Sequence, residues 1–261
     1  MIDKQKINDF IQDNEINPRI IVESEVHSTN LYAKDLISKG LNTNTIILAE
    51  KQDSGKGRYD REWHSPKGGL YMTIILQPTN AILSYPLYGF ALACAAACAL
   101  EDLKGPAISL KWPNDLLSGE RKIGGILSEL IATISDHPKI VMGIGININN
   151  EASSLPESIR NISTSVVSET GRQLVIEHLA AKIINNLDDY LSEGRDPSGI
   201  LRDFRKRCTT IGRQVEVDTA GQLFSGRAMD VTDDGSLIIR DQYNNEQIVS
   251  AGEVSHLRSD Q

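Results

Sequence analysis

Two neighbouring apolar segments, residues 122–132 and 139–148, constrain the fold of this 261-residue chain more than any other feature. Each has the composition of a β-strand, and a strand that is apolar along its length must be covered on both faces. We therefore expect both segments in the middle of a sheet. Shorter strands are expected at residues 46–50, 69–77 and 107–112.

Helices are expected around this sheet. Ser28 and Thr29 are residue types that begin a helix, and Gly40 is a type that ends one, which predicts a helix over residues 30–39. Residues 85–102, rich in alanine and leucine, predict a second, packed helix. Further helices are expected at residues 7–11, 172–191 and 197–208, an extended stretch at 19–22, and a loop at 151–168.

The pattern changes near residue 210. Beyond it, short β-type runs alternate with turn signals such as Asp234-Gly235. A series of short hairpins is typical of a small β-barrel. The sequence therefore predicts two domains, residues 1–210 and residues 211–261.

The bulk composition excludes several classes of protein. The net charge is −8 and the pI is near 5.2, which disfavours general DNA or RNA binding because phosphate contacts need clustered Lys and Arg. The predicted barrel, residues 211–261, carries four bases and nine acids. No apolar run is long enough to span a bilayer, and the N-terminus lacks an apolar targeting segment. We expect no DNA partner and no membrane.

The cysteines indicate a reducing compartment. Cys94, Cys98 and Cys208 are too few, and odd in number, for a disulfide framework. Cys94 and Cys98 lie four residues apart on one predicted helix face, where free Cys behaves as a small apolar residue. They lack the further ligands that a metal needs, and the histidines show no metal-spaced pair. We expect a cytoplasmic protein without a metal bound by its own side chains.

Residues 55–63, GKGRYDREW, have the composition of an anion-binding loop. Gly55 and Gly57 allow the backbone to turn and approach a ligand closely. Arginine binds phosphate through two parallel hydrogen bonds. No Gly-Lys-Ser/Thr follows and no helix opens here, so this is not a Walker loop. Taken alone, the segment is more typical of a solvated surface loop. Its cations are Lys56, Arg58 and Arg61.

Three later segments place polar groups at strand ends. Residues 111–115, KWPND, end a predicted strand, where ligands often bind, although a simple turn with a packed Trp fits too. Lys122 begins a strand and would usually reach out to solvent. The following Gly124-Gly125 is unusual in a strand and often marks close approach of a ligand or another backbone. Residues 143–147, GIGIN, repeat that theme and end in Asn147.

Together these segments resemble the biotin protein ligases, that is, the biotin–[acetyl-CoA-carboxylase] ligases. Six motifs occur in order, so a chance match is very improbable. They are Ser28-Thr29-Asn30, Gln52, residues 55–63, residues 111–115, residues 122–129 and residues 143–147. Lys56 departs from the family, which has arginine there; charge is kept but the two-pronged fork is lost.

The resemblance implies an α+β fold with a mixed central β-sheet flanked by helices, similar to class II synthetases, and a small C-terminal SH3-like β-barrel. It implies that ATP activates biotin to biotinyl-5′-AMP, with Mg²⁺, before transfer to a lysine of a biotin carboxyl carrier protein. A homodimer is possible. Some members carry an N-terminal winged-helix repressor domain; only 27 residues precede Ser28, so we expect an enzyme that does not repress transcription.

The resemblance also implies roles for individual residues. The expected catalytic residues are Lys122, Arg58 and Lys111. Biotin is expected to contact Ser28, Thr29, Asn30, Gln52, Lys56, Gly57, Arg58, Lys122, Gly124, Gly125 and Gly143. ATP is expected to contact Gly55, Arg61, Trp63, Asn114, Asp115 and Asn147.

Two alternatives stay open. A lipoate-type ligase has a related fold and the same two-step chemistry, but its characteristic arginine-rich Ser-Gly-Gly-Gly stretch is not found here. A catalytically inactive biotin-binding module is the other alternative, and the presence of both Lys111 and Lys122 argues against it.

Overall fold

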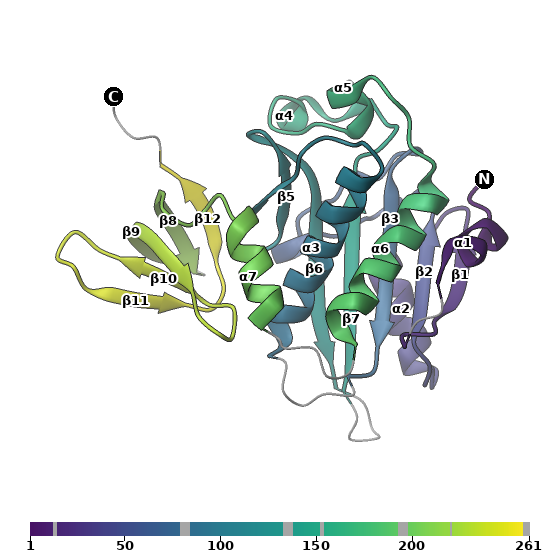
Figure 1. Cartoon of the computed structure of the whole chain (residues 1–261), viewed down its shortest axis with the longest axis horizontal. Helices are drawn as coiled ribbons and strands as arrows, with labels where there is room; N and C mark the ends of the chain where they lie inside the picture. Colours follow the sequence, from purple (N-terminus) through teal and green to yellow (C-terminus); the bar gives the residue numbers. More distant parts are fainter. Residues whose placement is uncertain are drawn as a thin grey trace.

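A seven-stranded mixed sheet forms the centre of the larger part of the molecule (Figure 1). The computed structural model describes residues 1–12, 15–78, 84–132, 138–151, 154–192, 198–219 and 221–257. The strand order is β1-β2-β3-β7-β6-β5-β4, in which only β1 and β2 pair in parallel. The strands are β1 (Arg19–Glu23), β2 (Thr45–Ala49), β3 (Leu70–Leu76), β4 (Ser109–Lys111), β5 (Asp115–Ser118), β6 (Arg121–Ile131) and β7 (Lys139–Ile146).

The two most apolar strands, β6 and β7, lie inside this sheet, with β7 at its centre. This confirms the position expected from their composition. Alternate residues of a strand face opposite sides, so Ile46 and Leu48 of β2 join the larger core while Ile47 joins a smaller core with Val141 on the other face.

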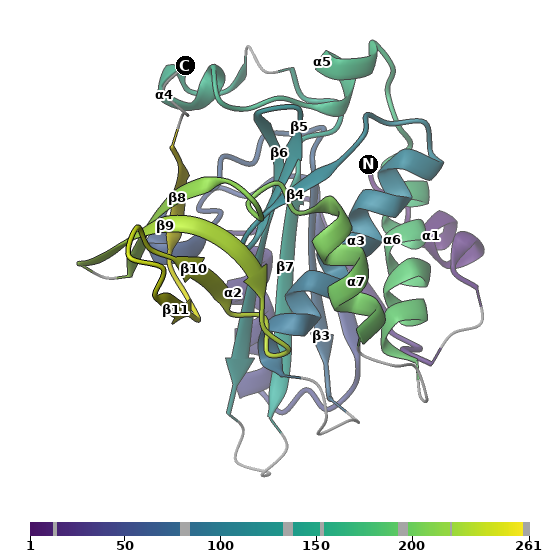
Figure 2. The same ribbon diagram turned by 60° about the vertical axis from the view of Figure 1, so that its left-hand side comes forward.

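Helices cover both faces of the sheet (Figures 1 and 2). On the larger core side, α3 (Tyr85–Asp102) packs against α6 (Ile176–Leu191) and α7 (Ser198–Arg207), with Phe90 stacked on Phe204 at 3.8 Å between ring centroids. The alanine-rich α3 allows this close packing. α2 (Thr29–Ser38) covers the smaller core, and α1 (Lys4–Phe10) packs against α6. No helix of the described ranges combines the length and apolar character that a bilayer crossing requires.

The C-terminal part is an antiparallel five-stranded sheet of order β11-β10-β9-β8-β12, beside α7 in Figure 2. It agrees with the expected small SH3-like barrel, and the α+β class is confirmed. The boundary at residue 210 stays a prediction. The strands are β8 (Gln214–Thr219), β9 (Gln222–Val231), β10 (Leu237–Arg240), β11 (Glu246–Val249) and β12 (Glu253–His256).

Several short elements were not expected. β5 lies where only a turn was expected, and β12 was missed. The expected loop at residues 151–168 contains α4 (Glu157–Arg160) and the start of α5 (Val166–Thr170), so that expectation was wrong there. Elements of four or five residues are too short for hydrophobic periodicity to show, and β5 exists because it pairs with β4 and β6.

Candidate active site

A cavity of about 290 Å³ opens where one end of the central sheet meets the glycine-bearing loop and the C-terminal sheet. Its walls come from the start of α2, the loop, the β4–β5 turn, β6, β7, the segment after β7 and the start of β12. The predicted residues that line it are Ser28, Thr29, Asn30, Gln52, Lys56, Gly57, Arg58, Arg61, Trp63, Lys111, Asn114, Asp115, Lys122, Gly125, Gly143 and Asn147.

Two predicted residues, Gly55 and Gly124, are not among the lining residues. A Cβ on Gly55 would lie 2.4 Å from the carbonyl oxygen of Trp63, and one on Gly124 would lie 2.9 Å from the carbonyl oxygen of Gly145. Both glycines therefore permit close packing within the chain. Gly125, the next residue of β6, faces the cavity because side chains alternate along a strand.

Gln52 organises one end of the cavity. Its Oε1 accepts hydrogen bonds from the backbone N–H of Thr29 at 2.8 Å and from the Thr29 hydroxyl at 3.1 Å, while its Nε2 donates to Ser65 Oγ at 2.8 Å. Ser28 is the N-cap residue of α2, as expected, but its side chain makes no capping hydrogen bond. The amide of Gln52 caps the helix instead and is fixed in one orientation.

Asn30 is also fixed by protein contacts. Its Oδ1 accepts from the Thr73 hydroxyl at 2.7 Å, and its Nδ2 donates at 3.2 Å to both the carbonyl of Leu127 and the carboxylate of Glu129. A Cβ on Gly143 would fall 2.1 Å from Asn30 Oδ1. Gly143 thus makes room for Asn30, which in turn lines the cavity.

The indole of Trp63 lies over bare backbone of β6 and β7. A Cβ on Gly145 would lie 2.3 Å from Trp63 Nε1, and one on Gly125 would lie 3.5 Å from its ring. The Nε1 group is buried without a hydrogen-bond partner, and Lys122 Nζ lies 5.4 Å from the ring centroid. Gly145 was expected to clear space as part of the segment 143–147, but it was not named as a site residue. Its two-residue spacing from Gly143, which places both on one face of a strand, was the available signal.

Two lysines and one carboxylate meet where β4, β5 and β6 lie side by side. Lys122 Nζ forms an ion pair with Asp115 at 2.5 Å. Lys111 is paired with Asp115 in the β4–β5 register. Burial lowers the pKa of Lys111, and Lys122 lowers it further, whereas Asp115 acts to raise it. The three strands therefore bring a compact cationic group to the cavity, as the motifs predicted.

Two of the three loop cations, Arg58 and Arg61, are held by the C-terminal part of the chain. Arg58 Nη1 donates to the carbonyl of Gly252 at 2.9 Å, and the Arg61 guanidinium forms a two-pronged ion pair with Glu253. This ion pair raises the pKa of Arg61. Glu253 was missed because its strand, β12, was not expected.

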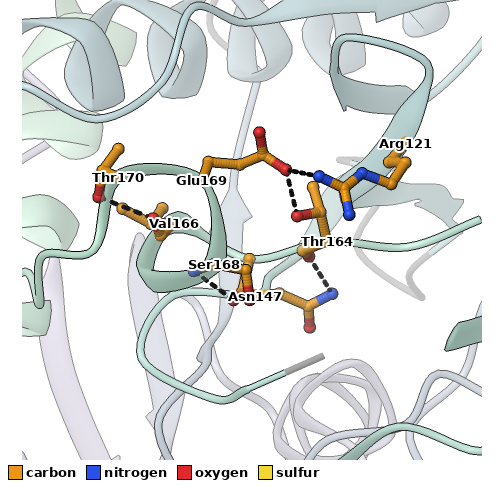
Figure 3. A network of polar contacts seen from close by, with 8 residues as sticks. Arg121, Asn147, Thr164, Val166, Ser168, Glu169 and Thr170 are labelled. Carbon is orange, nitrogen blue, oxygen red and sulfur yellow. Dashed lines mark hydrogen bonds and ion pairs between the residues drawn. The ribbon is translucent and has the colours of Figure 1, made fainter. Parts of the chain in front are cut away.

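Asn114 and Asn147 are engaged with the protein. Asn114 Nδ2 donates to the carbonyl of Ile126 at 2.8 Å. Asn147 Nδ2 donates to the carbonyl of Thr164 at 3.0 Å (Figure 3). Its Oδ1 accepts from Asn150 at 3.1 Å. The protein thus holds both ends of the Asn147 amide, and the residue is buried. In the described part of the chain, no group of three or more His, Cys, Asp or Glu side chains is placed to hold a metal.

The fold and cavity define a class of ligases. Residues 22–147 match the Biotin/lipoate A/B protein ligase family, and residues 210–257 match the Biotin protein ligase C terminal domain. The chain belongs to the biotin protein ligase family.

Individual relatives show the same relationship. The chain is 30% identical over 237 residues to the bifunctional ligase/repressor BirA of Bacillus subtilis, covering 89% of this chain and 72% of that protein. It is 30% identical over 237 residues to the biotin–[acetyl-CoA-carboxylase] ligase of Paracoccus denitrificans, covering 87% and 96%. The biotin protein ligase of Aquifex aeolicus in complex with biotin and ATP superposes with a TM-score of 0.76 at 26% identity, covering 92% and 99%.

Proposed function

We infer that this protein is an ATP-dependent biotin ligase, which converts biotin to biotinyl-5′-AMP and transfers the biotinyl group to a lysine of a carrier protein. This conclusion rests on the cavity, whose lining combines hydrogen-bonding side chains near the start of α2 with a cluster of cations. The chain that forms this cavity belongs to the biotin protein ligase family. The match to the biotin-ligase C-terminal domain, and the biotin-bound relatives, disfavour the lipoate alternative.

In the first step a carboxylate oxygen of biotin bonds to the α-phosphorus of ATP, and the bond to the pyrophosphate leaving group breaks. Both reactants are anionic, so the site must supply positive charge where phosphate charge grows. We propose Lys122 for the oxygens around the reacting centre, Arg58 for the carboxylate–phosphate junction, and Lys111 for nearby phosphate charge. Their positions around one cavity support these roles.

In the second step an uncharged lysine amine of the carrier attacks the biotinyl carbonyl carbon. An amide bond forms, the bond to AMP breaks, and the amine releases a proton. The mixed anhydride must be protected from water until then. The loop at residues 55–63 borders the cavity and suits this shielding role.

The other residues that line the cavity are assigned to biotin or to the nucleotide. We propose that Ser28, Thr29 and Gln52 meet the polar head of biotin, where fixed donors and acceptors give specificity. Arg61, Trp63 and Asp115 are proposed for the nucleotide. We propose that Asn30 acts through its neighbours, because its amide oxygen and both of its N–H groups are hydrogen-bonded within the protein. Asn147 is buried and is held by Thr164 and Asn150, so we propose that it shapes the cavity wall.

Magnesium accompanies ATP and usually keeps phosphate and water ligands, with one or two carboxylates from the protein. The cavity fits this mode, since Asp115 offers a carboxylate in its lining. Bound there, the ion would screen phosphate charge. Three further points stay predictions: transfer to a carboxylase carrier protein, a cytoplasmic location and a homodimer. The three cysteines are free thiols, in line with a reducing compartment.

A direct test measures biotin-dependent exchange of labelled pyrophosphate into ATP, followed by transfer of labelled biotin to a purified carrier domain. We expect exchange and transfer with biotin, and neither with lipoate. Exchange driven by lipoate alone would overturn the assignment, and binding of biotin without any exchange would indicate an inactive binding module.

A further inference from the structure

A segment that follows β7 returns to clamp the main chain of Lys122. β7 ends beside Gly124 of β6, and residues 162–164, called here the return segment, take its place next to Lys122. The Lys122 N–H donates to the carbonyl of Ile162 at 2.8 Å, and the Thr164 N–H donates to the carbonyl of Lys122 at 2.8 Å. Both main-chain polar groups of Lys122 are therefore held by this segment.

Glu169, on α5, holds the return segment in place (Figure 3). The same carboxylate oxygen accepts a short hydrogen bond from the Thr164 hydroxyl and a 2.6 Å ion-paired hydrogen bond from Arg121. Asn147, which follows β7, donates to the Thr164 carbonyl. Thr164 is fully buried and the Glu169 side chain is only 20% exposed, so the Thr164–Glu169 hydrogen bond is largely shielded from water, whereas the Arg121 side chain is 48% exposed.

We propose that Glu169 is a positioning residue for Lys122, acting through Thr164 and the return segment. The proposal rests on the function inferred above, in which the Lys122 ammonium stabilises the reacting oxygens. A lysine ammonium sits on a flexible four-carbon stem, so its placement depends on how firmly the main chain beneath it is fixed. Displacements of about 1 Å can lower a rate roughly a hundredfold.

Through Thr164, Glu169 also positions one wall of the cavity. Ile159 and Ile162, which line it, lie just before Thr164 in the chain. A carboxylate suits this position because one charged oxygen accepts from both a hydroxyl and a guanidinium. Glutamine keeps the shape and an acceptor oxygen but loses the charge, which weakens both hydrogen bonds.

The test compares Glu169→Gln with Glu157→Gln, a matched change on the exposed surface of α4. Amide hydrogen exchange at Lys122 and Thr164, read by NMR, reports the clamp without any substrate. Pyrophosphate exchange reports the chemistry. We expect Glu169→Gln to speed exchange at both amides, to leave Met142 of β7 protected, and to lower kcat roughly tenfold. Glu157→Gln should match the wild type in all three.

A second pair of variants guards against a general folding defect. Thr164→Val removes the hydroxyl and should reproduce the Glu169→Gln result, whereas Thr164→Ser keeps the hydroxyl and should retain wild-type amide protection. The double variant Glu169→Gln/Thr164→Val should be no slower than either single one, because both break the same link.

Wild-type protection of Lys122 and Thr164 in Glu169→Gln would overturn the proposal, and so would an unchanged kcat despite faster amide exchange. If the wild-type protein showed no biotin-dependent pyrophosphate exchange, the proposed function would fail instead. The amide measurements would then still decide whether Glu169 anchors the main chain of Lys122.

Discussion

At the level of single residues, the shape and charge of the cavity depend on the positions of its lysines, its carboxylate and its glycines. Lys122 is paired with Asp115 and faces the Trp63 ring, whereas burial lowers the pKa of Lys111. Gly145 leaves the space that the Trp63 indole fills. Single substitutions should therefore separate electrostatic from steric effects.

Lys122→Ala should lower the rate of biotin-dependent pyrophosphate exchange roughly a hundredfold or more, because a fixed cation at the reacting oxygens is lost. Circular dichroism should show an intact fold. Lys104→Ala, on the exposed turn after α3, serves as the control and should leave the rate unchanged. Near-normal exchange in Lys122→Ala would remove Lys122 from its proposed role.

Gly145→Ala should displace the Trp63 indole, since the added Cβ would lie 2.3 Å from its Nε1. We expect a shift in tryptophan emission and weaker biotin and ATP binding. Gly199→Ala is the matched control in α7, where a Cβ meets nothing closer than Arg202 at 3.9 Å; it should be neutral or stabilise the fold by up to about 1 kcal/mol. An unchanged Trp63 environment in Gly145→Ala would contradict this packing.

At the scale of elements, the loop at residues 55–63 is ordered by contacts at both ends. The Gly57 N–H donates to the Arg61 carbonyl at 2.7 Å, which closes the loop on itself. Arg58 and Arg61 then reach β12 through Gly252 and Glu253. The loop is thereby tied to the C-terminal sheet.

Glu253→Gln should loosen this loop while costing less than about 1 kcal/mol of stability, because the Arg61 ion pair is largely exposed. The check is tryptic cleavage after the basic residues of the loop, which should become faster without ligand. Glu246→Gln breaks an ion pair with Arg240 within the C-terminal sheet and should leave this cleavage unchanged. Equal cleavage rates in the two variants would show that Glu253 does not restrain the loop.

At the scale of the whole molecule, the C-terminal sheet is joined to the larger part through Trp112 and His256. The Trp112 indole is fully buried and donates to the Gly235 carbonyl at 3.0 Å, and its backbone N–H donates to the Thr210 hydroxyl at 3.1 Å. The Thr210 hydroxyl also lies 3.1 Å from His256 Nε2. This junction contains a titratable group near positive charge.

Burial, Lys111 and Arg213 together lower the pKa of His256 to about 4. An unfolded histidine titrates near 6.5, so between these values the unfolded chain binds the extra proton and the folded protein does not. Stability contributed by neutral His256 is therefore present above about pH 6.5 and lost as the pH falls toward 4. We expect the free energy of unfolding to fall more steeply over that window in the wild type than in His256→Gln, measured by urea titration. Parallel pH profiles would rule out this linkage.

The longer elements and the chemistry of the site could be predicted from the amino-acid sequence. The central strands, the long helices and the cationic loop follow from apolar periodicity, glycine and charge, all of which are local properties of the chain. The ordered motifs indicated biotin and ATP, and most of the named residues do surround one cavity.

The separate roles of those residues became visible only in the three-dimensional arrangement of the chain. Gly124 and Gly125 are neighbours, yet strand register turns just one of them to the cavity. Asn147 anchors the chain beside Thr164, and Glu253 meets Arg61 from a strand nearly two hundred residues away. Such contacts arise from pairing between distant segments, and a partner far along the chain leaves no local pattern at either position.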